Sequence, residues 1–172
     1  MTIHSGHPFA GEPDDVRRFR GRLGGTVTLW TAGEGGSRAG LTVTSLMVAN
    51  GEPAHVLALV DPDSDLHDVV EETGRCVVQT LAWGDRGLAE MFAGTAPAPG
   101  GVFAHAEWEQ TAYGPVLRGA AAWVGAVVVE ERAIGWSSLV TCRVEEVRVG
   151  EEAEPALAHR RGRFVRLGST RE

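Results

Sequence analysis

Short runs of apolar residues, broken by turns, cover most of this chain, and few segments show the spacing of an amphipathic helix. Residues 26–32 alternate between apolar and polar positions, as a strand does. Residues 56–60 and 76–81 are apolar almost throughout, which is typical of strands covered on both faces. Residues 120–129 are also apolar on both faces, and we interpret them as barrel core or subunit interface. Residues 134–149 are expected to form a further pair of strands. The pattern predicts a mainly β protein.

Three short helices are expected between these strands. Val16, Phe19 and Leu23 repeat at helical spacing and predict an amphipathic helix over 15–23, with its arginines on the wet face. A second helix is expected over 66–72, beginning after Asp63, Ser64 or Asp65, all of them good N-cap residues. A helix start with free backbone amides suits a phosphate group. A third helix over 88–92 should end at Gly94.

The length of 172 residues fits one domain with a sizeable core. We expect a flexible N-terminal arm at 1–14 and a single domain over 15–172, because the first residues lack any periodicity. A net charge of -7 disfavours nucleic acid and anionic membranes as partners. The amino end has no signal-peptide pattern and no run is long enough to span a membrane, so we expect a cytoplasmic protein.

Cysteine and histidine are sparse and scattered. Cys76 and Cys142 both lie in apolar segments, which favours buried reduced thiols over a disulfide or a two-ligand metal site. The histidines form no metal-binding pair, so no metal site is expected. Patterns of the serine hydrolase, P-loop and dinucleotide-binding types are absent from the sequence.

The stretch from Arg38 to Pro53 carries hydroxyl groups along a strand-like run that ends in an Asn-Gly turn. Strand alternation points Thr42 and Thr44 to one face and Ser45 to the other, and a bend near Ser45 would bring both sets to one ligand. Its plain interpretation is a half-buried strand followed by a turn. The segments that follow favour a binding site.

Four elements in order carry a resemblance to a known family. They are Arg38 with Gly40-Leu41-Thr42, the turn at Glu52-Pro53, the loop bearing His67, and 74–81 followed by Leu88-Ala89-Glu90-Met91-Phe92-Ala93-Gly94. In this order the chain resembles the flavin reductase-like, FMN-binding split-barrel family over about residues 16–167. The resemblance implies an antiparallel split β-barrel with short peripheral helices.

The resemblance also implies a flavin site. Arg38, Ser64 and His67 would bind the phosphate, and Gln79, at the position of the family's Asn, would contact the polar edge of the ring. Backbone and hydroxyl groups of the central stretch would contact ring and phosphate, from Thr42, Thr44, Ser45, Ala49 and Asn50. The implied cofactor is FMN, with FAD as the alternative, and NADH or NADPH is the implied co-substrate.

The implied function is that of an NAD(P)H-dependent flavin reductase, a homodimer that supplies reduced flavin to a partner monooxygenase. Hydride transfer between two stacked rings needs no acid or base from the protein. An alternative is a non-catalytic or weakly active flavin-binding protein, because Gly135-Trp136-Ser137 replaces a Gly-x-His motif of the family and Asp63 and Asp65 flank Ser64. An empty structural homodimer is a third alternative.

Overall fold

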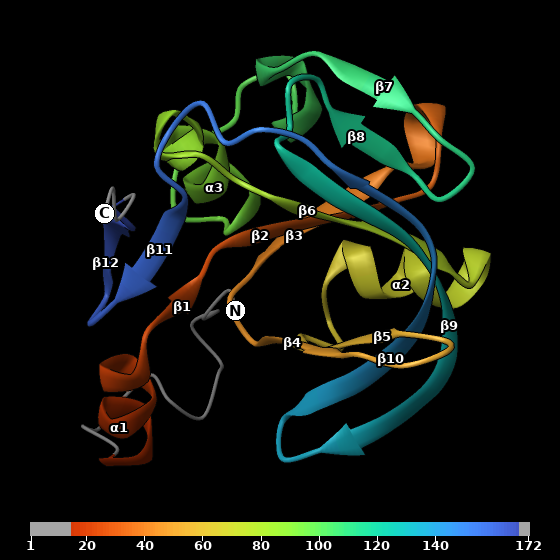
Figure 1. The fold of residues 1–172 in the computed structure, drawn as a ribbon, viewed down its shortest axis with the longest axis horizontal. Coiled ribbons are helices and arrows are strands. Elements are labelled where there is room, and N and C mark those ends of the chain that lie inside the picture. The colour runs from red at the N-terminus through yellow and green to blue at the C-terminus, as the bar shows by residue number, and fades with distance from the viewer. Residues whose placement is uncertain (1–14, 169–172) are drawn as a thin grey trace.

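The structure is a computed structural model that describes residues 15–168, and antiparallel strands make up most of it (Figure 1). The expected arm at 1–14 lies outside the described residues. The strands are β1 (Gly25–Thr26), β2 (Thr28–Ala32), β3 (Ala39–Val43), β4 (Leu46–Ala49), β5 (His55–Val60), β6 (Arg75–Thr80), β7 (Trp108–Gln110), β8 (Pro115–Leu117), β9 (Ala122–Ile134), β10 (Ser137–Val149), β11 (Leu157–Arg160) and β12 (Arg163–Arg166).

Short helices connect these strands, close to where the sequence predicts them. The α-helices are α1 (Asp15–Leu23), α2 (Asp65–Thr73) and α3 (Arg86–Phe92), and the 3₁₀-helices are η1 (Gly35–Ser37), η2 (Trp83–Asp85) and η3 (Val102–His105). Ser64 is the N-cap of α2, and Gly74 ends the helix in the left-handed conformation. Between residues 15 and 168, the helices are too short or too polar to cross a bilayer.

Seven strands form one sheet in the order β3-β2-β6-β9-β10-β5-β4, and every neighbouring pair is antiparallel. The sheet curls into a half-barrel (Figure 1). Its two edge strands, β3 and β4, are consecutive in the chain, and the break at Thr44 and Ser45 separates them. The Ser45 hydroxyl donates to the Leu59 carbonyl at 2.7 Å, which holds this bend against β5. The predicted mainly β fold, with an antiparallel split barrel and short peripheral helices, is confirmed.

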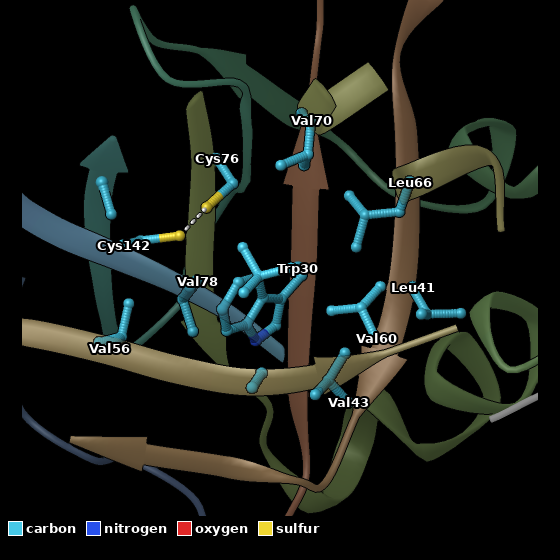
Figure 2. Close-up of a cluster of buried hydrophobic side chains, with 14 residues drawn as sticks. Trp30, Leu41, Val43, Val56, Val60, Leu66, Val70, Cys76, Val78 and Cys142 are labelled. Atoms are coloured by element: carbon cyan, nitrogen blue, oxygen red, sulfur yellow. Dashed lines mark hydrogen bonds between the residues drawn. The ribbon is translucent and has the colours of Figure 1, made fainter. Parts of the chain in front are cut away.

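Buried side chains fill the inside of the half-barrel (Figure 2). Trp30 is 1% exposed and lies among residues from β3, β5, β6 and β10, while α2 inserts Leu66 and Val70 into the same cluster. Cys76 and Cys142 meet there with their sulfur atoms 3.8 Å apart, as buried free thiols. Their predicted burial is confirmed, and the reduced state stays a prediction. Mutual hydrogen bonding and burial raise the pKa of Cys76.

A second apolar cluster covers the outer face of the sheet. It joins α3, η3 and β11 to Leu29 of β2 and Leu81 after β6. Two small sheets border this cluster, one of β1, β11 and β12 and one of β7 and β8. The two clusters therefore pack on both faces of β2. The Thr42 hydroxyl, which donates to the Ala89 carbonyl, fixes α3 relative to β3.

Two expectations about the strands are wrong. Residues 134–149 do not form a strand pair, because β9 and β10 are two strands of 13 residues each that make one long hairpin. β5 is not covered on both faces, since Leu59 is 42% exposed while Val56, Ala58 and Val60 are buried. The apolar pattern was misleading because the outer face of β5 also carries apolar side chains, although Leu59 on that face is largely uncovered in the described chain.

Candidate functional site

A groove of about 640 Å³ opens between the turn after β2, strand β3, the start of α2 and the segment that joins α3 to η3. This volume lies within the range of about 300–1,000 Å³ that small-molecule sites occupy. The lining residues are Gly35, Gly36, Arg38, Ala39, Gly40, Leu41, Asp63, Ser64, Asp65, Met91, Phe92, Gly94, Gly100, Gly101, Val102, Phe103 and Ala104. The first residues of the hydroxyl-bearing stretch thus lie beside a groove.

Aromatic rings form one wall of this groove. The ring of Phe92 lies 5.1 Å from that of Phe103 and 5.7 Å from that of Trp108, both edge to face. Phe92 and Phe103 also line the groove. Gly40 allows this packing, because a Cβ there would lie 2.6 Å from a ring carbon of Phe92. The groove therefore has an apolar wall, although Phe92 is only 4% and Phe103 only 9% exposed.

Arg38 lines the groove and stacks on this wall, with its guanidinium carbon 4.6 Å from the centre of the Phe103 ring. Arg38 is half-buried. Within residues 15–168 the guanidinium has no hydrogen-bond or ion-pair partner. Stacking on a ring leaves the N–H groups of an arginine free for an anion. Arg38 therefore offers an unpaired cation to whatever enters the groove.

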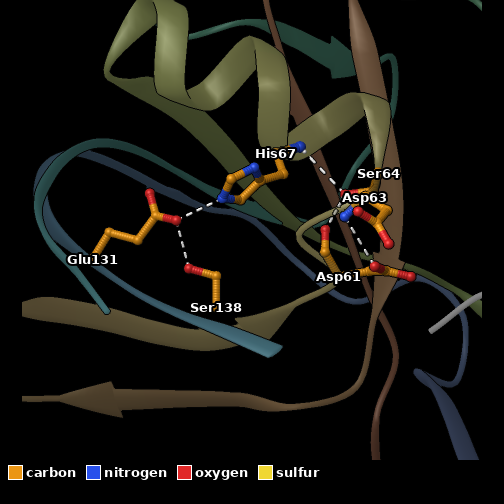
Figure 3. Close-up of polar contacts among 6 residues, drawn as sticks. All are labelled: Asp61, Asp63, Ser64, His67, Glu131 and Ser138. Carbon is orange, nitrogen blue, oxygen red and sulfur yellow. Dashed lines mark hydrogen bonds and ion pairs between the residues drawn. The ribbon is translucent and has the colours of Figure 1, made fainter. Parts of the chain in front are cut away.

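The loop before α2 forms another part of the lining, and its polar groups bond to one another (Figure 3). The Ser64 hydroxyl donates to the Asp61 carbonyl at 2.7 Å and accepts from the His67 backbone N–H at 3.3 Å. The Asp63 backbone N–H donates to the Asp61 carboxylate at 3.0 Å. Ser64 lines the groove, as expected of a ligand, but its hydroxyl already serves as the cap of α2.

His67 points to the β9–β10 hairpin and does not line the groove (Figure 3). Its Nε2 lies 2.5 Å from Oε1 of Glu131, and the Ser138 hydroxyl donates to the same oxygen at 2.5 Å. The hydrogen bond from Ser138, followed by that from His67, lowers the pKa of Glu131. His67 thus ties the first turn of α2 to the hairpin, and its proposed contact with phosphate stays a prediction.

Replacing Glu131 by Gln should lower the free energy of unfolding by about 1 kcal/mol at neutral pH. The hydrogen bonds from His67 and Ser138 would lose their charged acceptor, and the effect is modest because Glu131 is half-exposed. The lowered pKa means that the carboxylate stabilises the fold above its ordinary value of 4.5 and loses this effect as pH falls through the lowered value. Urea unfolding of wild type and E131Q at neutral and acid pH should show the difference shrinking with acidity. E130Q, on the same strand, is the control, and an equal difference at both pH values would contradict this account.

Thr42 and Gln79 lie inside the protein. The Thr42 hydroxyl donates to the Ala89 carbonyl at 2.7 Å, and the residue is 7% exposed. Gln79 is 1% exposed, donates to Thr31 and to the Pro115 carbonyl, and accepts from the Leu117 backbone N–H at 2.7 Å. Both side chains therefore join elements of the fold, Thr42 binding α3 to β3 and Gln79 binding β8 to β6.

The remaining predicted contacts lie on the bend and on β4, outside the groove lining. Thr44, Ala49 and Asn50 are exposed, while Ser45 is half-buried with its hydroxyl bonded to Leu59. Their contact with flavin stays a prediction, and the structure brings only Arg38 and Ser64 of the predicted set into one groove.

Sequence reasoning missed the groove residues that come from the loop after α3. Phe103 forms part of the wall, and Gly100 and Gly101 before it have φ angles of 81° and 93°, which other residues rarely adopt. A pair of adjacent glycines before an aromatic residue was the available signal. The sequence does not show the role of these glycines, because the loop contacts β3 only in the folded chain.

A smaller hollow of about 180 Å³ lies near the start of η2. Its lining includes Asp85, Glu151, Glu152 and Glu154 and no cationic side chain. Burial, helped by the charge of Glu154, raises the pKa of Asp85. Such a lining repels a phosphate, so the larger groove is the better candidate for a phosphorylated ligand.

Known proteins with similar sequences and structures agree with this fold. The family model of the flavin reductase like domain matches residues 20–168. The chain is 30% identical to the FMN reductase (NADH) RutF of Ancylobacter novellus over 132 residues, which cover 76% of this chain and 72% of that protein. It is 26% identical to the 4-hydroxyphenylacetate 3-monooxygenase reductase component of Pseudomonas aeruginosa, covering 80% of this chain and 82% of that one.

Among solved structures, the chain is similar to BorF, the flavin reductase component of a bacterial two-component tryptophan halogenase. The TM-score is 0.77 at 25% identity, with 89% of this chain and 96% of BorF covered. The family model covers nearly the whole described chain, and the half-barrel has the same course as that reductase component. This chain therefore belongs to the flavin reductase-like domain family.

Proposed function

We propose that this chain is an NADH-dependent flavin reductase that binds FMN in the groove beside β3. The observation that carries the proposal is the unpaired guanidinium of Arg38, stacked on Phe103 inside a groove of suitable size. The relative from Ancylobacter novellus, named an FMN reductase that uses NADH, supports the choice of both ligands.

The residues of the groove fit the parts of a flavin. Arg38 would bind the phosphate, and the wall of Phe92 and Phe103 would pack against the ring. Leu41 and Met91 add apolar surface that excludes water. When bound, the flavin supplies the acceptor for a hydride from the nicotinamide. The protein then needs only to orient the two rings and to keep water away, because this transfer uses no protein acid or base.

Steady-state oxidation of NADH, with and without FMN, tests this proposal. We expect the fluorescence of FMN to be quenched on titration with the protein. The rate of NADH oxidation with FMN should be well above the rate measured without protein. FAD and NADPH, each measured in parallel, define the preferred pair. Absence of both FMN binding and FMN-dependent oxidation would refute the proposed function.

Flavin binding without efficient turnover is the second candidate function. Asp63 and Asp65, which line the groove, favour it because they oppose a phosphate at that corner. Tight FMN binding combined with background oxidation of NADH and NADPH would identify this alternative.

We also propose that the protein is a homodimer. Several apolar side chains of the sheet are exposed, including Met47 (64%), Val48 (60%) and Leu59 (42%) on β4 and β5, and Val129 (47%) and Ile134 (42%) on β9. β4 is also an edge strand of the sheet. A second copy that covers this surface by two-fold symmetry would bury both the apolar side chains and the strand edge.

The double variant Met47→Asp, Val48→Asp should be a monomer, because two carboxylates would have to be buried in the interface. Light scattering after gel filtration should give twice the chain mass of 18.3 kDa for wild type and the single mass for the variant. Val149→Asp, at the far end of β10 and 77% exposed, is the matched control and should remain dimeric. A wild-type protein that is monomeric at micromolar concentration would refute this proposal.

Release of reduced flavin to a partner monooxygenase is the further part of the proposed function. Two similar proteins are reductase components, one of a 4-hydroxyphenylacetate 3-monooxygenase and one of a two-component tryptophan halogenase. Anaerobic ultrafiltration after reduction by NADH should then recover reduced flavin in the filtrate. Reduced flavin retained on the protein would argue against this supply role. The location of the protein in the cytoplasm stays a prediction.

A further inference from the structure

Helix α1 presents its apolar side chains to solvent. Val16, Phe19 and Leu23 share one face of the helix and are 72%, 64% and 66% exposed. Gly21 lies on the opposite face and is directed at the turn between β11 and β12, because a Cβ there would lie 3.9 Å from Cα of Arg161. The apolar face of α1 therefore points away from the rest of the described chain, whereas most helices of globular proteins bury that face.

Half of the 16 basic residues gather on this helix and on the strand turn beside it. The backbone N–H of Arg161 donates to the Gly21 carbonyl at 2.9 Å, and Nε of Arg160 donates to the Arg22 carbonyl at 3.4 Å. These bonds join α1 to residues 160–166 in one surface, which we call the arginine face (Figure 1). Its eight arginines are all exposed and are Arg17, Arg18, Arg20, Arg22, Arg160, Arg161, Arg163 and Arg166.

The arginine face has little acid to balance its charge. Asp15 is the only acidic residue in its two segments, and it pairs with Arg18 at 3.3 Å. Among the described residues, Arg17, Arg161 and Arg163 have no ion-pair partner. The net charge of -7 belongs to the whole chain, and at physiological salt a charge acts over only about 8 Å. The expectation that anionic membranes are disfavoured therefore does not hold for this face.

We propose that the arginine face binds the surface of a membrane that contains anionic lipids. Phe19 and Leu23 would enter the apolar boundary below the headgroups, and the arginines around them would contact lipid phosphates. Arginine suits this position, because its long side chain can reach a headgroup while the helix lies flat. The groove lining and the arginine face share no residue, so this binding does not need flavin.

Two other polyanions fit this face less well. A nucleic-acid backbone offers phosphates but no apolar surface for Phe19 and Leu23. An acidic protein could supply both, but neither of the two hollows described above borders α1, so a protein partner would have no pocket there to fill. The exposed apolar side chains among arginines therefore favour a bilayer.

Sedimentation with vesicles of equal parts phosphatidylglycerol and phosphatidylcholine tests the proposal on the full-length protein. Wild type should sediment with these vesicles, stay in the supernatant with pure phosphatidylcholine, and dissociate as salt is raised. Phe19→Asp should lower the affinity about tenfold or more, because a carboxylate would have to enter the apolar boundary. Val149→Asp is the matched control and should bind as wild type does, since Val149 is 77% exposed and lies outside the arginine face. Circular dichroism of each variant reports its fold.

A second pair of variants tests the charge. Arg17→Gln with Arg161→Gln should lower the affinity about tenfold or more, whereas Arg132→Gln with Arg148→Gln, on the β9–β10 hairpin, should not change it. Wild type that fails to bind the anionic vesicles at low salt, or a folded F19D protein that binds them as wild type does, would overturn the proposal. Polyglutamate is the probe for an acidic protein. Binding of wild type to polyglutamate, without binding to vesicles, would overturn the proposal in favour of a protein partner.

Discussion

Replacing Gly36 by Trp should abolish FMN-dependent NADH oxidation while the protein remains folded. Gly36 lines the groove, its φ angle does not require glycine, and a side chain there would meet no atom within 4 Å. The fold therefore tolerates an indole at this position, but the indole takes space that the flavin needs. We expect FMN affinity to fall at least about tenfold, as occurs when a site loses most of its complementarity.

Gly87→Trp is the matched control for this variant. Gly87 also has open space around it, but it lies on α3 and does not line the groove. Thermal unfolding of both variants should resemble that of wild type, and only G36W should lose FMN binding and turnover. Full activity in a folded G36W protein would show that the flavin binds elsewhere.

Replacing Gln79 by Leu should lower the free energy of unfolding by about 2–4 kcal/mol and leave FMN affinity nearly unchanged. Leu has a similar volume, but it leaves the Leu117 backbone N–H without its acceptor in a buried position. It also removes the amide that donates to Thr31 and to the Pro115 carbonyl. The substitution therefore weakens the contact between β8 and β6 and leaves the groove unchanged.

Chemical unfolding and FMN titration of the same samples separate the two roles of Gln79. Gln110→Leu is the control, because Gln110 is exposed and donates to two backbone carbonyls at the surface, so its loss should cost little. A Q79L protein that is as stable as wild type but has lost FMN affinity would contradict the structural role. It would restore the interpretation of Gln79 as a ligand of the flavin ring.

The fold could be predicted from local signals because those signals agree along the chain. Alternating residues at 26–32 became β2, and Ser64 with its flanking acids marked the start of α2. The long hairpin of β9 and β10 was the exception. The hairpin turns at Gly135 and Trp136, at the start of this range, and residues 137–149 contain no turn signal that could divide them into two strands.

The site was harder to predict, because hydrogen bonds inside the protein compete for the same polar groups as a ligand. Thr42 and Gln79 have side chains suited to a flavin, but the carbonyl of Ala89 and the backbone of β8 use them. The chemistry of a single side chain does not show whether a ligand or another group of the protein lies nearer to it. Arg38, just before β3, lines the groove, and its contact with a flavin phosphate stays a prediction.

The aromatic wall depends on contacts that no local pattern contains. Phe103 follows a proline-rich loop and meets Phe92 and Arg38 only because the second apolar cluster holds this loop against β3. His67 gave the opposite outcome. The loop that bears it lies at the groove, but Glu131, more than sixty residues later in the chain, binds its imidazole away from the groove.

A crystal structure of the protein grown with FMN tests the central claim most directly. The account predicts density for the isoalloxazine against Phe92 and Phe103, with the phosphate in contact with the Arg38 guanidinium. Density for FMN on the outer side of β4, beside Thr44 and Asn50 and away from Arg38, would contradict it.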